Sequence, residues 1–111
     1  MVLVHARQAQ NPVLLLTNFR YKLTPHLAED ILVNTQSLIL LSLRYHAEYP
    51  LYLKMRLQEV RERRGSEQQI IVILLKDAKD DPGLTGLSLT CFDYRATLMC
   101  AWRYSVRFNA L

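Results

Sequence analysis

The sequence predicts a single α/β domain with a central mixed sheet flanked by helices. Short runs of aliphatic and β-branched residues, of the length of strands, alternate along the chain with longer segments of helical period. The 111 residues are enough for one hydrophobic core. Half of them are apolar and 22% are charged, which indicates a folded domain rather than a disordered chain.

The first half of the chain predicts four strands and one short helix. Val2–Ala6 has the length and composition of a first strand. An Asn-Pro pair opens Asn11–Asn18, and Asn at an N-cap with Pro in the first turn indicates a helix. In Phe19–Leu23 the basic residues Arg20 and Lys22 alternate with Tyr21, a pattern typical of a half-exposed strand. Ile31–Val33 and Leu38–Arg44 are further strands, and the continuous apolar run of the second predicts burial on both faces.

Tyr49–Arg64 is the clearest predicted helix. Apolar residues at i, i+4 and i+7 share one of its faces, and they are Leu53, Leu57 and Val60. Glu59 and Arg63 are placed to pair one turn apart, and Gly65 suits the C-terminal cap.

The last part of the chain predicts a strand, a helix and a strand. Ile70–Leu75 is rich in β-branched residues and has the pattern of a buried strand. The sequence Asp80-Asp81-Pro82 can open a helix that runs to Tyr94, although two glycines weaken that prediction. Ala96–Ala101 is the last predicted strand.

Charge and cysteine content restrict the partners. The net charge of +4 and the pI of about 9.3 permit a nucleic-acid or acidic partner without requiring one. No apolar run approaches the ~20 residues of a membrane span and no secretory signal is recognisable, so we expect no membrane partner.

Cys91 and Cys100 form no CxxC pair, and we predict buried free thiols in a reducing compartment. The three histidines lack ligand spacing, so we predict neither a metal site nor a cofactor.

The most informative stretch is SLRYHAEYPLY, Ser42–Tyr52. The apolar run before it breaks off into Arg44, Tyr45 and His46, and Pro50 separates these from the next helix. This pattern predicts a strand-to-helix turn that carries basic and aromatic side chains. Such turns are where α/β folds place their sites, because the scaffold is rigid and the loop is free to vary.

Four segments of the chain resemble the central domain of one family of repair proteins. In chain order they are VLVHARQAQNPVL, then SLRYH with Pro50, Tyr52 and RLQ, then VILLKDAKDDP, then ATLMCAW. Nearly the whole chain is thus similar to the excision-repair cross-complementing group one family (yeast RAD10-type), the non-catalytic partner of the XPF nuclease. The resemblance implies a restriction-endonuclease-like (XPF nuclease-like) core over residues 1–111. It also implies a role in nucleotide excision repair in the nucleus.

The resemblance implies that the nuclease site is inactive. Active XPF-type relatives carry a Gly-Asp, then a strand with Glu-Arg-Lys and another Asp. Here Asp30 takes the first position, Ile39–Leu41 replaces the triplet and Tyr45 replaces the last Asp. Hydrocarbon side chains cannot bind magnesium, so we expect no catalytic residues. The rival interpretation is a degenerate nuclease that uses Asp30 with Asp77, although the acidic cluster around Asp77 is more typical of a solvated loop or helix cap.

In the resembled family the vacated groove binds a short, Gly-rich, aromatic-bearing peptide of the damage-verification protein XPA. The residues that match its pocket are Arg7, Asn11, Tyr45 and Tyr52, with Ser42, Arg44 and Arg56 nearby. These side chains suit an extended peptide, because they combine flat apolar area with donors and acceptors for its backbone. Two alternatives stay open: Asn11 can serve only as a helix cap, and Tyr52 can serve only in packing.

The resemblance further implies weak binding of single-stranded or junction DNA. The candidate phosphate contacts are Arg56, Arg61, Arg63, Arg64 and Arg103, and Arg20 and Lys22 lie on an exposed strand edge. Three glutamates interleave with the arginine run, and this pattern favours a solvated, salt-bridged helix face over a DNA-binding one. We expect DNA binding to be sequence-independent and sensitive to salt.

The family continues into a tandem helix-hairpin-helix domain that pairs with XPF. No such domain is recognisable in this sequence, which leaves pairing with an XPF-type subunit open. A second interpretation is a meiotic or recombination scaffold of the same superfamily that has another XPF-like partner.

Overall fold

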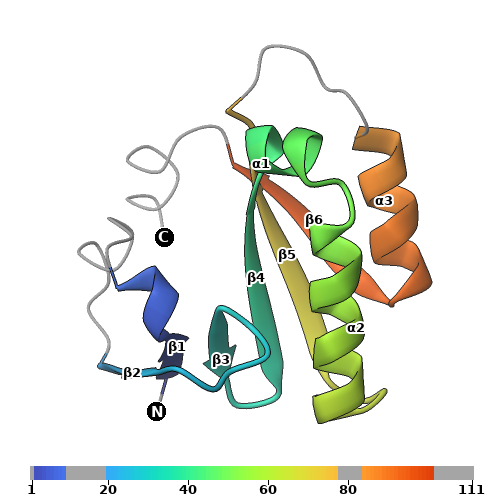
Figure 1. Ribbon diagram of the computed structural model, residues 1–111. Coiled ribbons are helices and arrows are strands. Elements are labelled where there is room, and N and C mark those ends of the chain that lie inside the picture. The colour runs from blue at the N-terminus through green and yellow to red at the C-terminus, as the bar shows by residue number, and fades with distance from the viewer. Residues whose placement is uncertain (1, 10–19, 78–83, 102–111) are drawn as a thin grey trace.

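The computed structural model describes residues 2–9, 20–77 and 84–101, and these form one mixed sheet with helices (Figure 1). The strand order is β2-β1-β3-β4-β5-β6. The strands are β1 (Val2–His5), β2 (Tyr21–Thr24), β3 (Ile31–Val33), β4 (Gln36–Ser42), β5 (Gln69–Leu75) and β6 (Ala96–Ala101). Strand β3 runs antiparallel to both β1 and β4, and the other pairs are parallel. The predicted α/β class with a mixed sheet is therefore confirmed.

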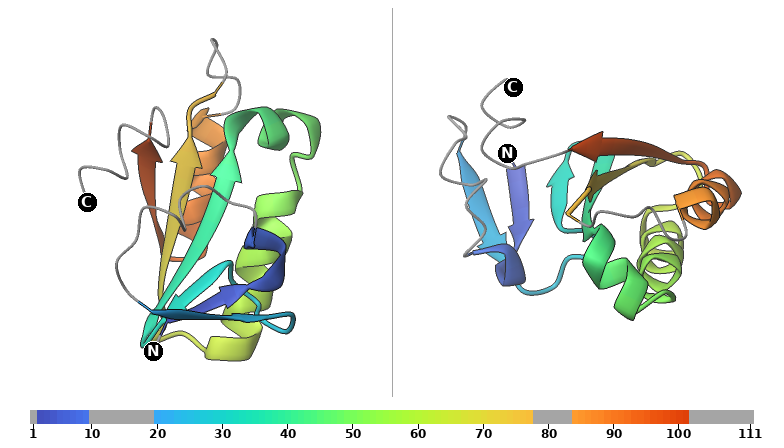
Figure 2. Two further views of the ribbon diagram at one scale, coloured as in Figure 1. Left: turned by 90° about the vertical axis from the view of Figure 1, so that its left-hand side faces the viewer. Right: turned by 90° about the horizontal axis from the view of Figure 1, so that it is seen from above.

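The described helices lie along one face of β4, β5 and β6 (Figure 2). They are α1 (Leu43–Glu48), α2 (Tyr52–Arg64) and α3 (Leu84–Asp93), and a short 3-10 helix, η1 (Ala6–Gln8), follows β1. None of the described helices is long and apolar enough to cross a membrane. Because β1, β3 and β4 are adjacent, η1 at the end of β1 lies beside the C-terminal half of β4.

The core lies between the sheet and α2 with α3. Alternate residues of β4 and β5 are buried there, and the parallel register sets Ile39 beside Val72 and Leu41 beside Leu74. The apolar face predicted for α2 supplies the facing layer with Leu53, Leu57 and Val60, all at most 1% exposed. The residues on the other face of β4 are only half-buried, whereas the sequence predicted a strand covered on both faces.

The turn after β4 differs from the prediction. Strand β4 ends at Ser42, and Leu43 and Arg44 belong to α1 rather than to the strand. Ser42 is the N-cap of α1, and its hydroxyl accepts a hydrogen bond from the backbone N–H of Tyr45. Helix α2 begins at Tyr52 instead of Tyr49, because the chain turns at the Pro that separates the two helices.

Most other predicted elements are confirmed within a residue or two. Gly65 ends α2 with a φ of 86°, a left-handed value that glycine adopts at no steric cost. The predicted helix at 11–18 and the predicted start of α3 at 80–82 lie outside the described residues. Cys91 is buried, and burial raises the pKa of its thiol to about 11, whereas Cys100 is exposed, contrary to the prediction.

Candidate functional site

The predicted site residues come together where β1 and β4 end and α2 begins. A pocket of about 310 Å³ opens there, lined by Arg7, Gln8, Leu40, Leu41, Ser42, Tyr45 and Tyr52. We call this pocket the groove. Arg7 and Gln8 come from η1, Tyr45 from α1 and Tyr52 from the first turn of α2. Of the seven peptide-binding residues predicted from the sequence, four line the groove: Arg7, Ser42, Tyr45 and Tyr52.

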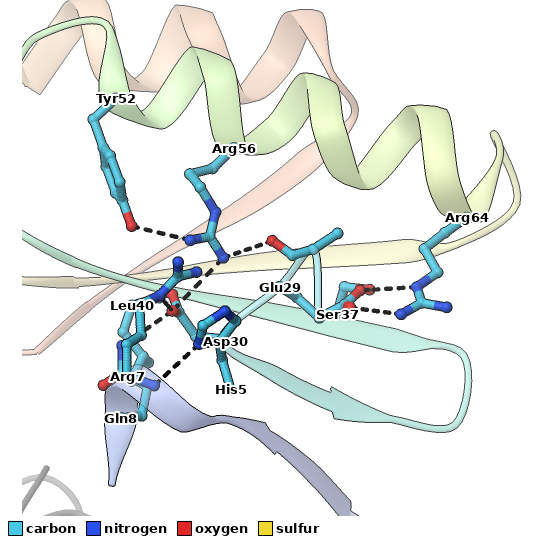
Figure 3. Close-up of polar contacts among 11 residues, drawn as sticks. His5, Arg7, Gln8, Glu29, Asp30, Ser37, Leu40, Tyr52, Arg56 and Arg64 are labelled. Atoms are coloured by element: carbon cyan, nitrogen blue, oxygen red, sulfur yellow. Dashed lines mark hydrogen bonds and ion pairs between the residues drawn. The ribbon is translucent and has the colours of Figure 1, made fainter. Parts of the chain in front are cut away.

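Asp30 lies beneath the groove and is fully buried (Figure 3). Its Oδ1 accepts hydrogen bonds from Arg7 Nε at 2.9 Å and Gln8 Nε2 at 3.0 Å. Its Oδ2 accepts one from the backbone N–H of Leu40 at 2.8 Å. Both oxygens of Asp30 are thus occupied by N–H donors, and a divalent cation would have to displace them.

Arg56 is a structural neighbour of the groove rather than part of its lining. Only 6% of the residue is exposed, and its guanidinium lies 3.7 Å from Asp30 Oδ1. It donates to the carbonyl of Ala28 at 2.6 Å and to the hydroxyl of Tyr52 at 3.2 Å. The guanidinium carbon also lies 5.7 Å from the centre of the Tyr52 ring. Arg56 therefore holds Tyr52 in place, and little of its side chain is left exposed for the predicted DNA contact.

Three tyrosines form an aromatic cluster at the rim of the groove. The Tyr45 ring meets the Tyr52 ring edge-on, with centres 5.0 Å apart and planes at 78°. It also lies 4.7 Å from the Tyr49 ring, at 34°. Tyr52 packs against the core cluster and also lines the groove, so its position is compatible with both the packing and the binding interpretation. Burial raises the pKa of Tyr52, and its hydroxyl stays protonated at neutral pH.

Asp77 follows β5 and binds the start of α1. Its Oδ2 accepts from the Ser42 hydroxyl at 2.5 Å, and its Oδ1 accepts from the backbone N–H of Arg44 at 2.9 Å. Partial burial alone would raise the pKa of Asp77, but these hydrogen bonds outweigh it and lower the pKa. Asp77 is thus a helix-capping carboxylate. No group of three or more His, Cys, Asp or Glu side chains in the described ranges could hold a metal ion.

The arginines at the end of α2 are held by contacts within the protein. Arg61 donates to the carbonyls of Tyr94 and Gln68, at 2.9 and 2.7 Å. Arg63 donates to the carbonyl of His26 at 2.9 Å and pairs with Glu59 at 3.4 Å, as predicted. These contacts fit the alternative of a salt-bridged helix face better than a run of free phosphate contacts.

Sequence reasoning missed a second buried carboxylate, Glu29. Arg64 binds its two oxygens at 2.7 and 3.1 Å, and the Ser37 hydroxyl donates to it at 2.6 Å. Burial alone would raise the pKa of Glu29, but these bonds prevail and lower the pKa. Arg64, predicted as a DNA contact, is therefore an ion-pair partner. No pattern in the sequence signals this pair, because its members lie 35 positions apart.

Three further predicted residues are not part of the groove's described lining. Asn11 and Arg103 lie outside the described residues. Arg44 is exposed on α1, where its backbone N–H binds Asp77. His46, on the same helix, has a buried Nδ1 without a hydrogen-bond partner in the described part of the chain, and burial lowers the pKa of its imidazole.

Residues 1–106 match the model of the Rad10 family, described as the binding domain of DNA repair protein Ercc1 (rad10/Swi10). The chain belongs to this family. It is 28% identical over 109 residues to DNA repair protein RAD10 of Saccharomyces cerevisiae, a match that covers 93% of this chain and 50% of the relative. The chain thus spans about half the length of that relative.

Solved structures show the same fold. XPF from Aeropyrum pernix superimposes with a TM-score of 0.76 at 13% identity, over 98% of this chain and 60% of that one. The same protein in complex with DNA gives a TM-score of 0.78 at 14% identity, with the same coverage. The XPF nuclease-like fold expected from the sequence resemblance is therefore confirmed, and at this identity the likeness concerns the fold alone.

Proposed function

We propose that this Rad10-family domain is a non-catalytic binding module of DNA repair, and that its groove docks an extended, Gly-rich peptide of XPA type. The observation that carries the proposal is that N–H donors of the protein occupy both carboxylate oxygens of Asp30. Both of its oxygens accept hydrogen bonds from Arg7, Gln8 and the Leu40 backbone, with a second guanidinium 3.7 Å away. Two guanidinium groups therefore lie beside the carboxylate that the resemblance matches to the first nuclease Asp, and the neighbouring positions Ile39–Leu41 offer no carboxylate, which supports the proposal.

The groove has the chemistry that a peptide needs. Tyr45 and Tyr52 present flat apolar area that loses little conformational entropy on binding. Arg7 is 39% exposed, and only its Nε is committed to Asp30, so the rest of its guanidinium can donate to peptide carbonyls. Glycines in the ligand would let its backbone approach the rings closely.

Binding of single-stranded or junction DNA is the second, weaker part of the proposal. Of the predicted arginines within the described ranges, Arg63 keeps 49% of its side chain exposed while it contacts Glu59 and His26. Arg20 directly precedes the edge strand β2 and Lys22 lies on it, and both are exposed. Such scattered charges favour sequence-independent binding that weakens as salt rises.

We further propose that the domain helps to recruit an XPF-type endonuclease in nucleotide excision repair in the nucleus. Family membership and the XPF-like fold support this role. The competing proposal is a meiotic or recombination scaffold that pairs with another XPF-like partner. Pull-down from nuclear extract discriminates them: recovery of such a partner without XPA favours the scaffold.

The first test is fluorescence anisotropy with a labelled Gly-Gly-Phe-containing XPA-type peptide. We expect saturable binding that Tyr45→Ala weakens at least tenfold, because the variant removes the ring that borders the groove. Tyr21→Ala, which truncates an exposed tyrosine on β2, is the matched control and should leave affinity unchanged. Absence of binding by folded wild-type protein would overturn the peptide-docking proposal.

A further inference from the structure

A second pocket adjoins the groove at the corner between α1 and α2. It has a volume of about 370 Å³ and is lined by Tyr45, Glu48, Tyr49, Pro50, Leu51, Tyr52 and Met55. Tyr45 and Tyr52 line both this corner pocket and the groove, so the two form one continuous surface. A ligand extended along the groove would reach the corner pocket by passing these two rings.

Packing does not account for the side chains of the corner pocket. Tyr49, Leu51 and Met55 are 51%, 68% and 65% exposed, although each is large and apolar. They lie within seven positions of one another, around the turn that joins α1 to α2. A contiguous apolar patch of this kind, set in a concave surface, is typical of a binding site rather than of ordinary surface.

The charge of the corner pocket differs from that of the groove. Glu48 is the one formally charged residue of its lining, and within the described ranges its side chain has neither an ion pair nor a hydrogen bond. The tilted rings of Tyr45 and Tyr49 add the negative potential of their faces. The groove, by contrast, is bordered by the guanidinium of Arg7. The lining of the corner pocket therefore carries a single formal charge, which is negative.

We propose that the corner pocket binds a Lys or Arg side chain of the peptide that docks in the groove. The inference rests on the proposed function for its ligand, and it adds a basic residue beside the Gly-rich aromatic segment. A cation over the tyrosine rings next to Glu48 gains both a cation–π contact and an ion pair. Met55 is unbranched and can adapt to the aliphatic part of such a side chain. A nucleic acid could also stack on the rings, but its phosphates would meet the Glu48 carboxylate.

The test compares three labelled peptides by fluorescence anisotropy. One contains the Gly-Gly-Phe core alone, one carries an added Arg beside the core, and one carries citrulline, which has the same shape without the charge. We expect the Arg peptide to bind roughly fivefold more tightly than the citrulline peptide. Glu48→Gln should abolish this difference and leave the core peptide unaffected. Glu62→Gln, which removes an exposed charge from α2 outside the pocket, should preserve it.

The outcomes separate the inference from the proposed function. If the core peptide binds but the Arg and citrulline peptides bind with equal affinity, the corner pocket does not distinguish a charged from a neutral side chain. The inference is then overturned, while the peptide-docking proposal stands. If the core peptide does not bind, the docking proposal fails. The pocket is then tested by following the Met55 methyl NMR resonance during titration with acetyl-arginine-methylamide. A shift of this resonance that Glu48→Gln abolishes supports the inference. If the resonance does not shift, the inference is overturned. A larger shift with oligo-dT would assign the pocket to nucleic acid and also overturn it.

Discussion

Glu29 and Asp30 are neighbours in the chain and both are fully buried, yet their carboxylates serve different regions of the molecule. Glu29 faces Arg64 and Ser37 at the far end of α2, in a network that borders neither of the two pockets described above. Asp30 faces Arg7 and Arg56 beneath the groove (Figure 3). Burial and charge are thus the same for the two carboxylates, and their partners differ. Arg7, which binds Asp30, also lines the groove, whereas Arg64 and Ser37, which bind Glu29, do not.

Among the changes to the buried carboxylates, Asp30→Asn should have the largest effect. Removing this charge leaves Arg56, with 7% of its side chain exposed, without a counter-ion and unable to reach water. A cation stranded in this way costs on the order of 3 kcal/mol of unfolding free energy. Urea denaturation checks the value, and anisotropy with the core peptide should register weaker binding because Arg7 loses the charge of its ion-pair partner. A stability change below about 1 kcal/mol would contradict the role given to Asp30.

Glu29→Gln is the matched change at the neighbouring position. We expect a smaller loss, about 2 kcal/mol, because 30% of the Arg64 side chain is exposed and its charge can turn to solvent. Peptide affinity should stay at the wild-type value, since none of the Glu29 partners lines the groove. A loss of affinity without a loss of stability would show that the two regions are coupled.

The pH dependence of unfolding tests whether the charge of Glu29 contributes to stability. The pKa of Glu29 is lower in the folded protein than its ordinary value of 4.5, so its stabilising effect is present above that value. The effect is lost as pH falls through 4.5 toward the folded pKa. The stability difference between wild type and Glu29→Gln should therefore be widest near pH 7 and narrow below pH 4.5. A difference that stays constant down to pH 3 would mean that Glu29 makes no charge-dependent contribution.

Asp77→Asn tests the partly exposed carboxylate and should have the smallest effect. Asn keeps an oxygen for the N–H of Arg44 and a polar partner for Ser42, so only the charge is lost. We expect less than about 1 kcal/mol in unfolding free energy, measured by the same denaturation. If Asp77 instead shared a catalytic metal site with Asp30, magnesium would stabilise the wild type and not the variant, which is the outcome that contradicts capping.

Local pattern predicted most of the fold. The strand at 70–75, the helix face of Leu53, Leu57 and Val60, and the cap at Gly65 each depend on neighbouring residues, and all are confirmed. The exceptions occur at the turn after β4. The apolar run continues past Ser42, while hydrogen bonding by the Ser42 hydroxyl, which hydropathy does not register, starts a helix.

Apart from η1 and α1, the sequence by itself determined the kinds and the order of the described strands and helices, and the aromatic and basic character of the turn at 42–52. Only the tertiary structure decided which charges meet. Asp30 and Arg7 are 23 positions apart and Glu29 and Arg64 are 35 apart, so no local pattern relates them. Sheet order and register bring η1 beside β4, and α2 spans both buried carboxylates. In the absence of those long-range contacts, an arginine that pairs inside the protein has the same sequence signature as one that is free to bind a ligand.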